Sequence, residues 1–276
     1  MAINQFSWTT KDGISIFAKD WQVEQAKAVF CLVHGFGEHS GRYDPTAAWF
    51  NERGIAWVGY DRRGHGQSGG PKGHTPNFDA FLDEIDQLLK ASQERYPGVP
   101  VYLYGHSMGG NLVLNHILRR KPNVKGAITT GTWIKLAQPP PPILLFLAKL
   151  MYKIYPAFTQ PTKLDASFIS SIPEEAKRYS NDPLNHDLMS SGTAVDMLRA
   201  SEWLQQYQGT FPIPLLMLHG SADKIIDPAA SRAFAERIKG QVEYKEWPGQ
   251  YHELQWDTMR EEVYQHTLNW VNQQLA

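Results

Sequence analysis

The chain has 276 residues, of which 42% are hydrophobic and 20% are charged, and its formal net charge at pH 7 is −1. These values are typical of an ordinary soluble globular protein with one large α/β domain, alone or carrying an insertion. Because the charge is close to zero, it gives no general attraction to nucleic acid or to anionic membranes, so we expect no nucleic-acid partner. The oligomeric state is left open.

The first residues contain two alternating segments and no export signal. Residues 1–8 lack the basic and apolar regions of a signal peptide, so we expect a cytoplasmic location. Residues 6–10 and 14–19 flank an Asp-Gly turn, and this arrangement predicts an antiparallel hairpin.

Short apolar runs alternate with helical patterns along most of the chain. The clearest predicted helix covers residues 78–96 and ends at Pro97-Gly98. The single cysteine, Cys31, lies in an apolar run, so we expect it in the core and not in a disulfide or a multi-cysteine metal site. Strands that alternate with helices predict a mainly parallel sheet with helices on both faces. The predicted buried strands cover residues 28–33, 55–60, 101–104, 126–130, 215–219 and 242–246.

A glycine-serine motif follows the strand predicted at residues 101–104. The run Gly105-His106-Ser107-Met108-Gly109 leads directly into a helical stripe at 111–118. This Gly-x-Ser-x-Gly pattern is typical of a sharp strand-to-helix turn that exposes one serine hydroxyl, and the glycines allow the close backbone approach that the turn requires. Ser107 is therefore a candidate nucleophile, whereas we expect His106 to point away from it.

One segment interrupts the alternation of strands and helices. Residues 133–192 contain no clear strand, so we expect an inserted helical cap there, with a core formed by residues 1–132 and 193–276. Thirteen residues, 143–155, form an apolar helix that is too short to span a bilayer, which needs about 20 residues. Such a helix, with Leu147 as a candidate substrate contact, can cover an acyl pocket, touch a lipid surface, or pack entirely into its own protein.

Two polar residues complete a predicted catalytic set. A serine hydroxyl needs a base and a group that orients the base. Asp223 follows the strand predicted at 215–219, and His252 follows the strand predicted at 242–246. Asp227 is the alternative acid, although it can instead cap a helix that starts near Pro228. The order Ser107, Asp223, His252 is the one expected of an α/β-hydrolase.

Two backbone groups are candidates for the oxyanion hole. The loop His34-Gly35-Phe36-Gly37 follows the strand at 28–33, so the N–H groups of Phe36 and Met108 can meet beside Ser107. We expect structural roles in loops for His34 and His219.

No cofactor and no metal are expected. Residues 64–69 match a dinucleotide-binding fingerprint, but Pro71, Gly73 and Pro76 follow in place of the helix that would hold a pyrophosphate. Asp61, Arg62 and Arg63 are expected to stabilise this loop.

The motifs together resemble those of the α/β-hydrolases, and more closely those of the monoacylglycerol lipase and lysophospholipase group. The resemblance covers nearly the whole chain, and its most specific part is Gly37-Glu38-His39-Ser40-Gly41-Arg42-Tyr43. It implies an α/β-hydrolase fold, a triad of Ser107, Asp223 and His252, and a Glu38–Arg42 pair that braces the oxyanion loop. It also implies that Ile226 borders the pocket for the leaving alcohol.

The function implied is hydrolysis of monoacylglycerols to fatty acid and glycerol through an acyl-enzyme. Lysophospholipase or general carboxylesterase activity is the alternative within the enzymes, and a non-catalytic binding module is the alternative from another class. The expected partners are a lipid ester substrate and, through the cap, a transiently contacted membrane or micelle.

Overall fold

An eight-stranded sheet forms the centre of the protein, whose residues 2–276 are described by a computed structural model. All its strands run parallel to one another except β2, which pairs antiparallel with both of its neighbours. The predicted N-terminal hairpin and the six predicted strands are therefore confirmed. Five of these six are buried throughout, whereas the strand at residues 242–247 lies at the edge of the sheet and is only partly buried. In spatial order the strands are β1 (Ala2–Thr9), β2 (Ser15–Gln22), β4 (Ile55–Tyr60), β3 (Ala28–Val33), β5 (Val101–His106), β6 (Gly126–Thr130), β9 (Leu215–Gly220) and β10 (Val242–Trp247).

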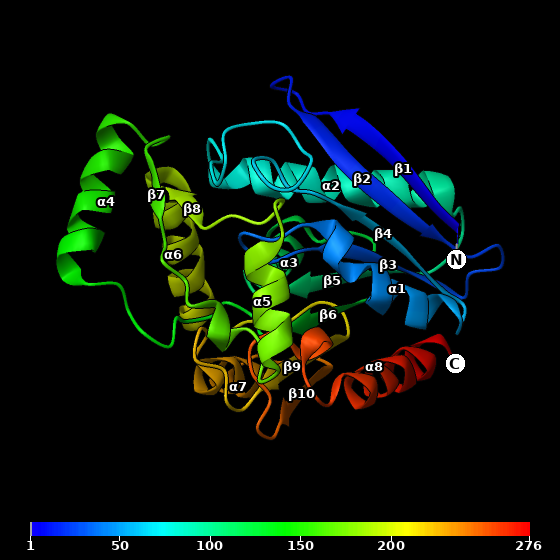
Figure 1. The fold of residues 1–276 in the computed structure, drawn as a ribbon. Coiled ribbons are helices and arrows are strands. Elements are labelled where there is room, and N and C mark those ends of the chain that lie inside the picture. The colour runs from blue at the N-terminus through cyan, green and yellow to red at the C-terminus, as the bar shows by residue number, and fades with distance from the viewer. Residues whose placement is uncertain (1) are drawn as a thin grey trace.

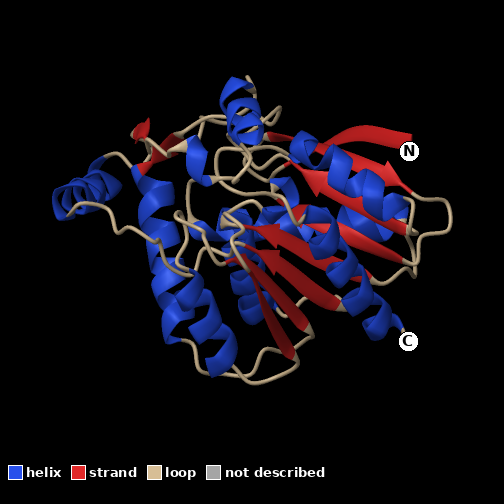
Figure 2. Cartoon of the chain, turned by 60° about the horizontal axis from the view of Figure 1, so that its bottom comes forward, coloured by secondary structure: helices blue, strands red, loops and turns tan. Residues whose placement is uncertain are grey.

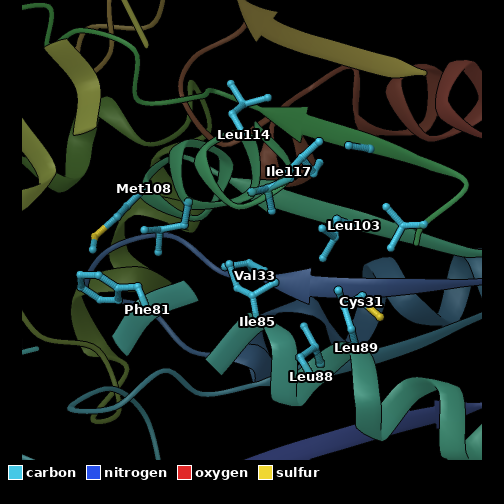
Figure 3. Close-up of a cluster of buried hydrophobic side chains, with 14 of the residues drawn as sticks. Cys31, Val33, Phe81, Ile85, Leu88, Leu89, Leu103, Met108, Leu114 and Ile117 are labelled. Carbon is cyan, nitrogen blue, oxygen red and sulfur yellow. The ribbon is translucent and has the colours of Figure 1, made fainter. Parts of the chain in front are cut away.

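Helices cover both faces of this sheet, as Figure 2 shows. Successive side chains of a strand point to opposite faces, so β3 sends Val29, Cys31 and Val33 into one core cluster and Phe30 and Leu32 into the other. Figure 3 shows the first cluster, in which Cys31 is a buried core residue as predicted. The helices α2 (Phe78–Arg95), α3 (Met108–Arg120), α6 (Ser191–Gln206) and α7 (Pro228–Arg237) contribute to the first cluster, and α1 (Asp44–Asn51) and α8 (Arg260–Leu275) to the second.

The longest helix illustrates how local sequence sets element boundaries. The side chain of Asn77 accepts a hydrogen bond from the Ala80 N–H and caps the start of α2. The helix ends at Arg95, just before Pro97-Gly98, so the predicted helix at 78–96 is confirmed within one residue. The short helices of 3-10 type are η1 (Ser40–Tyr43), η2 (Ala166–Phe168) and η3 (Leu254–Trp256).

The segment between β6 and α6 lies at one end of the molecule. It contains α4 (Pro142–Ile154), α5 (Pro173–Asn181), and two three-residue strands that the sequence did not predict, β7 (Thr159–Pro161) and β8 (Leu188–Ser190). Figure 1 shows α4 at the edge of the molecule, beside α6. No residue of α4 is buried, and its contact with α6 includes a hydrogen bond of 3.1 Å from the Tyr152 hydroxyl to Asp196.

Candidate active site

Ser107 occupies the sharp turn between β5 and α3. Its backbone φ is 54° and its ψ is −117°, an unusual conformation for a residue with a side chain. A Cβ on Gly105 would lie 2.7 Å from the Gly109 carbonyl oxygen, and one on Gly109 would lie 1.9 Å from that of Val33. Both glycines are therefore sterically required, as the motif predicted.

Asp223 and His252 meet beyond the ends of β9 and β10. Since these strands are adjacent and parallel, the loops that follow them leave the sheet at the same edge. The Nδ1–H of His252 donates a hydrogen bond of 2.6 Å to Oδ2 of Asp223, and both side chains are buried. Because Nδ1 is occupied in this way, Nε2 is the ring nitrogen left to accept a proton.

The charges of this pair shift both of their pKa values in the direction that favours ionisation. Burial alone would raise the pKa of Asp223, but the charge of His252 and hydrogen bonds from two histidines hold that pKa well below its ordinary value. Burial alone would lower the pKa of His252, but the charge of Asp223 outweighs it and raises the pKa above 6.5. His252 is therefore a stronger base than a free imidazole.

Ser107 and His252 line one cavity of about 590 Å³. Ile226 also lines it and is nearly fully buried, and its place beside the leaving alcohol stays a prediction. The structure does not bring Leu147 to this cavity, because that side chain is not among those that line it. Leu144, Leu145 and Ala148 are the residues of α4 that line the cavity instead.

The two candidate oxyanion donors lie in the elements that flank Ser107. Phe36 follows β3, and Met108 is the first residue of α3, where a helix leaves its N–H groups unpaired. Within residues 2–276, neither backbone N–H donates a hydrogen bond to protein. Both groups are therefore free to bind a developing negative charge.

A buried cluster of charged side chains holds the oxyanion loop in place. Glu38 accepts hydrogen bonds from the Gly35 N–H at 2.5 Å and from the Tyr43 hydroxyl at 2.9 Å. Arg42 lies 2.8 Å from Glu38, so the predicted bracing pair is confirmed. Arg42 also donates two hydrogen bonds of 2.7 Å to Glu253, the residue after His252. This bidentate pair connects the oxyanion loop to the loop of His252.

Two other histidines touch the pair formed by Asp223 and His252. His219, which was expected to have a structural loop role, donates its Nε2–H to Oδ2 of Asp223 at 2.9 Å. The ring of His106 lies 4.8 Å from the ring of His252, with its Nδ1 3.0 Å from Thr130 Oγ1. The first contact forms because the loop after β9 folds back onto its own strand, and the second joins residues that are far apart in the chain, so spacing along the chain did not reveal them.

Several other predicted residues have the structural roles expected of them. Asp227, the alternative acid, caps α7 by accepting a hydrogen bond from the Ala229 N–H. Asp61 accepts hydrogen bonds from the backbone N–H groups of Ser40 and Gln67, and so stabilises the loop at residues 61–77. No helix begins in that loop before Phe78.

Comparisons with known proteins place the chain among hydrolases. Residues 24–259 match the family described as "Serine aminopeptidase, S33". An uncharacterized abhydrolase domain-containing protein of Dictyostelium discoideum is 34% identical over 96% of this chain, which spans 28% of that relative. A monoacylglycerol lipase of Mycolicibacterium smegmatis is 28% identical over 97% of this chain and 96% of its own length. The crystal structure of Paleococcus ferrophilus monoacylglycerol lipase is 28% identical, with a TM-score of 0.83 over 99% of this chain and 100% of its own.

Proposed function

The chain belongs to the family described as serine aminopeptidase S33, within the α/β-hydrolases, and from this membership we propose that it hydrolyses monoacylglycerols to fatty acid and glycerol. The observation that carries the proposal is the cavity, which joins Ser107 and His252 to apolar side chains of α4 and α6. An ester carbonyl can sit beside the serine while its acyl chain lies against Leu144, Leu145 and Leu198.

The proposed chemistry proceeds through an acyl-enzyme. His252 takes the proton of Ser107 on Nε2 while its Nδ1–H stays on Asp223. The serine oxygen then attacks the ester carbonyl, and the N–H groups of Phe36 and Met108 bind the oxyanion. Glycerol leaves with the proton from His252. Water, deprotonated by the same histidine, releases the fatty acid.

The substrate class is tested by initial rates on three esters. 1-Lauroyl-glycerol, lauroyl-lysophosphatidylcholine and p-nitrophenyl butyrate represent the proposed activity and its two alternatives, with Ser107→Ala as the blank. We expect the highest kcat/KM for the glycerol ester. A preference for either other ester would overturn the substrate assignment and leave the triad in place. Activity that persists in the blank would overturn the mechanism.

We propose further that residues 133–192 form a cap that contacts lipid surfaces through α4. This helix exposes Ile143 and Phe146 by 62% each, and it carries Lys149 and Lys153. An exposed apolar helix face with lysines suits the interface of a membrane or micelle. None of the helices in residues 2–276 is long and apolar enough to cross a membrane. A cytoplasmic location stays a prediction.

Leu147→Glu tests this contact. Because Leu147 is exposed and outside the cavity, the change should leave hydrolysis of soluble p-nitrophenyl butyrate unchanged. On micellar 1-lauroyl-glycerol we expect the rate to fall about tenfold, because a charge replaces an apolar side chain that the micelle would cover on contact. The matched control is Ile3→Glu, which changes an exposed apolar residue of β1. Equal losses on both esters, or in both variants, would remove the lipid-contact proposal.

A further inference from the structure

Asp223 holds two histidines on one carboxylate oxygen. Its Oδ2 accepts the Nδ1–H of His252 at 2.6 Å and the Nε2–H of His219 at 2.9 Å. Its Oδ1 accepts the backbone N–H groups of Ile225 and Ile226 at 2.8 and 3.0 Å. The carboxylate is buried, so these four donors set its orientation without help from bulk water.

The protonation of His219 follows from its two partners. An ionised carboxylate can only accept, so Nε2 of His219 must carry a proton. Its Nδ1 lies 3.0 Å from the hydroxyl of Ser231 in α7, which can act as donor or acceptor. The ring therefore donates to Asp223 whether it is neutral or charged. His219 is itself the fifth residue of β9 and lies directly opposite Glu246 of β10, so the sheet holds its backbone in place.

We propose that His219 is a positioning residue for the reaction, whose Nε2–H holds the Asp223 carboxylate in the orientation that aligns His252. The inference rests on the triad of the proposed function but not on the identity of the ester. A second donor on Oδ2 also takes up part of the negative charge that His252 would otherwise receive. His219 thus limits how strongly Asp223 stabilises the protonated form of His252.

Removal of the His219 donor should change both the pH dependence and the plateau rate of the activity in a predictable direction. Without the His219 N–H, the full charge of Oδ2 faces His252, which favours the imidazolium and moves the acid limb of the activity to higher pH. The less constrained carboxylate also aligns His252 less well, so the plateau rate falls. The charged or titratable groups around His252 are Asp223, His106, Glu253 and Glu38, and Arg42 is paired with the last two. Those around His219 are Asp223 and Glu246, and Arg232 is paired with Glu246.

Two amide substitutions separate positioning from packing. In His219→Gln the amide nitrogen can take the place of Nε2 and still donate to Asp223. In His219→Asn the shorter amide reaches only the position of Nδ1, so it keeps the Ser231 contact and loses Asp223. The control is His116→Asn, which changes another buried histidine, bonded through Nε2 to Asp86 at 2.7 Å outside the cavity.

The readout is the rate at which a fluorophosphonate probe labels Ser107, measured against pH, because labelling needs His252 but no lipid. For His219→Asn we expect the plateau labelling rate to be about 10- to 100-fold lower than in the wild type. We expect the acid limb of the rate to lie about one pH unit higher. His219→Gln should return the acid limb of the labelling rate to its wild-type position. His116→Asn should lower the melting temperature of the protein and leave the acid limb where it is.

The inference is overturned if the limb of His219→Asn coincides with that of wild type, if His219→Gln loses as much as His219→Asn, or if His116→Asn moves the limb equally. Absence of labelling in the wild-type protein would instead overturn the proposed function. Should His219→Asn fail to fold, imidazole ¹⁵N NMR of the wild-type protein decides. A proton on Nε2 of His219 supports the inference, and an unprotonated Nε2 overturns it.

Discussion

Ser107→Ala is expected to lower kcat on the preferred ester by a factor on the order of 10⁶, the loss typical of a serine nucleophile that works with its histidine as a unit. The alanine keeps the Cβ that already occupies the strained turn at φ 54°, so it adds no new backbone conflict. The fold should therefore survive the change. Steady-state hydrolysis and thermal unfolding of the same preparation measure the two effects.

A second buried serine provides the matched control for this variant. Ser92 lies in α2, is fully buried, and does not line the cavity. Ser92→Ala should retain wild-type activity and remain open to labelling by a fluorophosphonate. If Ser107→Ala were labelled as fast as the wild type, the nucleophile would have to be another residue.

Arg42→Met should lower the free energy of unfolding by about 3–5 kcal/mol, because it leaves two buried carboxylates without their cation. Arg42 is buried between Glu38 and Glu253 and lies 4.7 Å from the ring of Tyr179 in α5. The methionine keeps most of the packing volume but not the charge. Chemical denaturation followed by fluorescence measures the loss.

The pH dependence of this loss identifies its electrostatic origin. Burial already raises the pKa of Glu38, and the charge of Arg42 opposes that rise. Without Arg42 the pKa of Glu38 rises further, so the destabilisation is largest at high pH and shrinks as the pH falls and Glu38 takes up a proton. Adding Glu38→Gln and Glu253→Gln to Arg42→Met should restore most of the stability at neutral pH.

Arg178→Met is the control for the buried cation. Arg178 is largely exposed and pairs with Glu175 on the surface of α5, so its loss should cost less than about 1 kcal/mol. If Arg42→Met cost no more than this control, the buried cluster would not be what holds the oxyanion loop. Activity should also fall in Arg42→Met, since its ion pairs connect Gly35 to the loop of His252.

Most of the fold follows from local patterns. Apolar runs such as residues 28–33 and 101–104 identify buried strands, and Pro97-Gly98 marks a helix end, because each signal depends on nearby residues alone. The candidate catalytic residues could also be predicted from the sequence, because Ser107 and His252 each follow a strand of a parallel sheet. Their roles remain proposals, as do the boundaries of the cap.

The features that the sequence could not reveal depend on how segments turn and fold back in three dimensions. Residues 143–147 are all apolar, so periodicity does not tell which face of α4 turns toward the cavity. The predicted contact at Leu147 is therefore wrong, and Leu144 and Ala148 line the cavity instead. The bond from His219 to Asp223 required the loop after β9 to fold back onto its own strand. No spacing rule predicts that return.

The pairing of β6 with β9 has a consequence for how the cap can vary. These strands are direct neighbours, with Ala127 opposite Leu215, although residues 131–214 separate them in the chain. Joining two strand ends through a long connection carries an entropy cost that grows only with the logarithm of its length, by about 0.6 kcal/mol for each doubling. Substantial lengthening or exchange of the part of this connection between β6 and α6 is therefore cheap for the sheet, so substrate range can diverge while the catalytic framework keeps its stability.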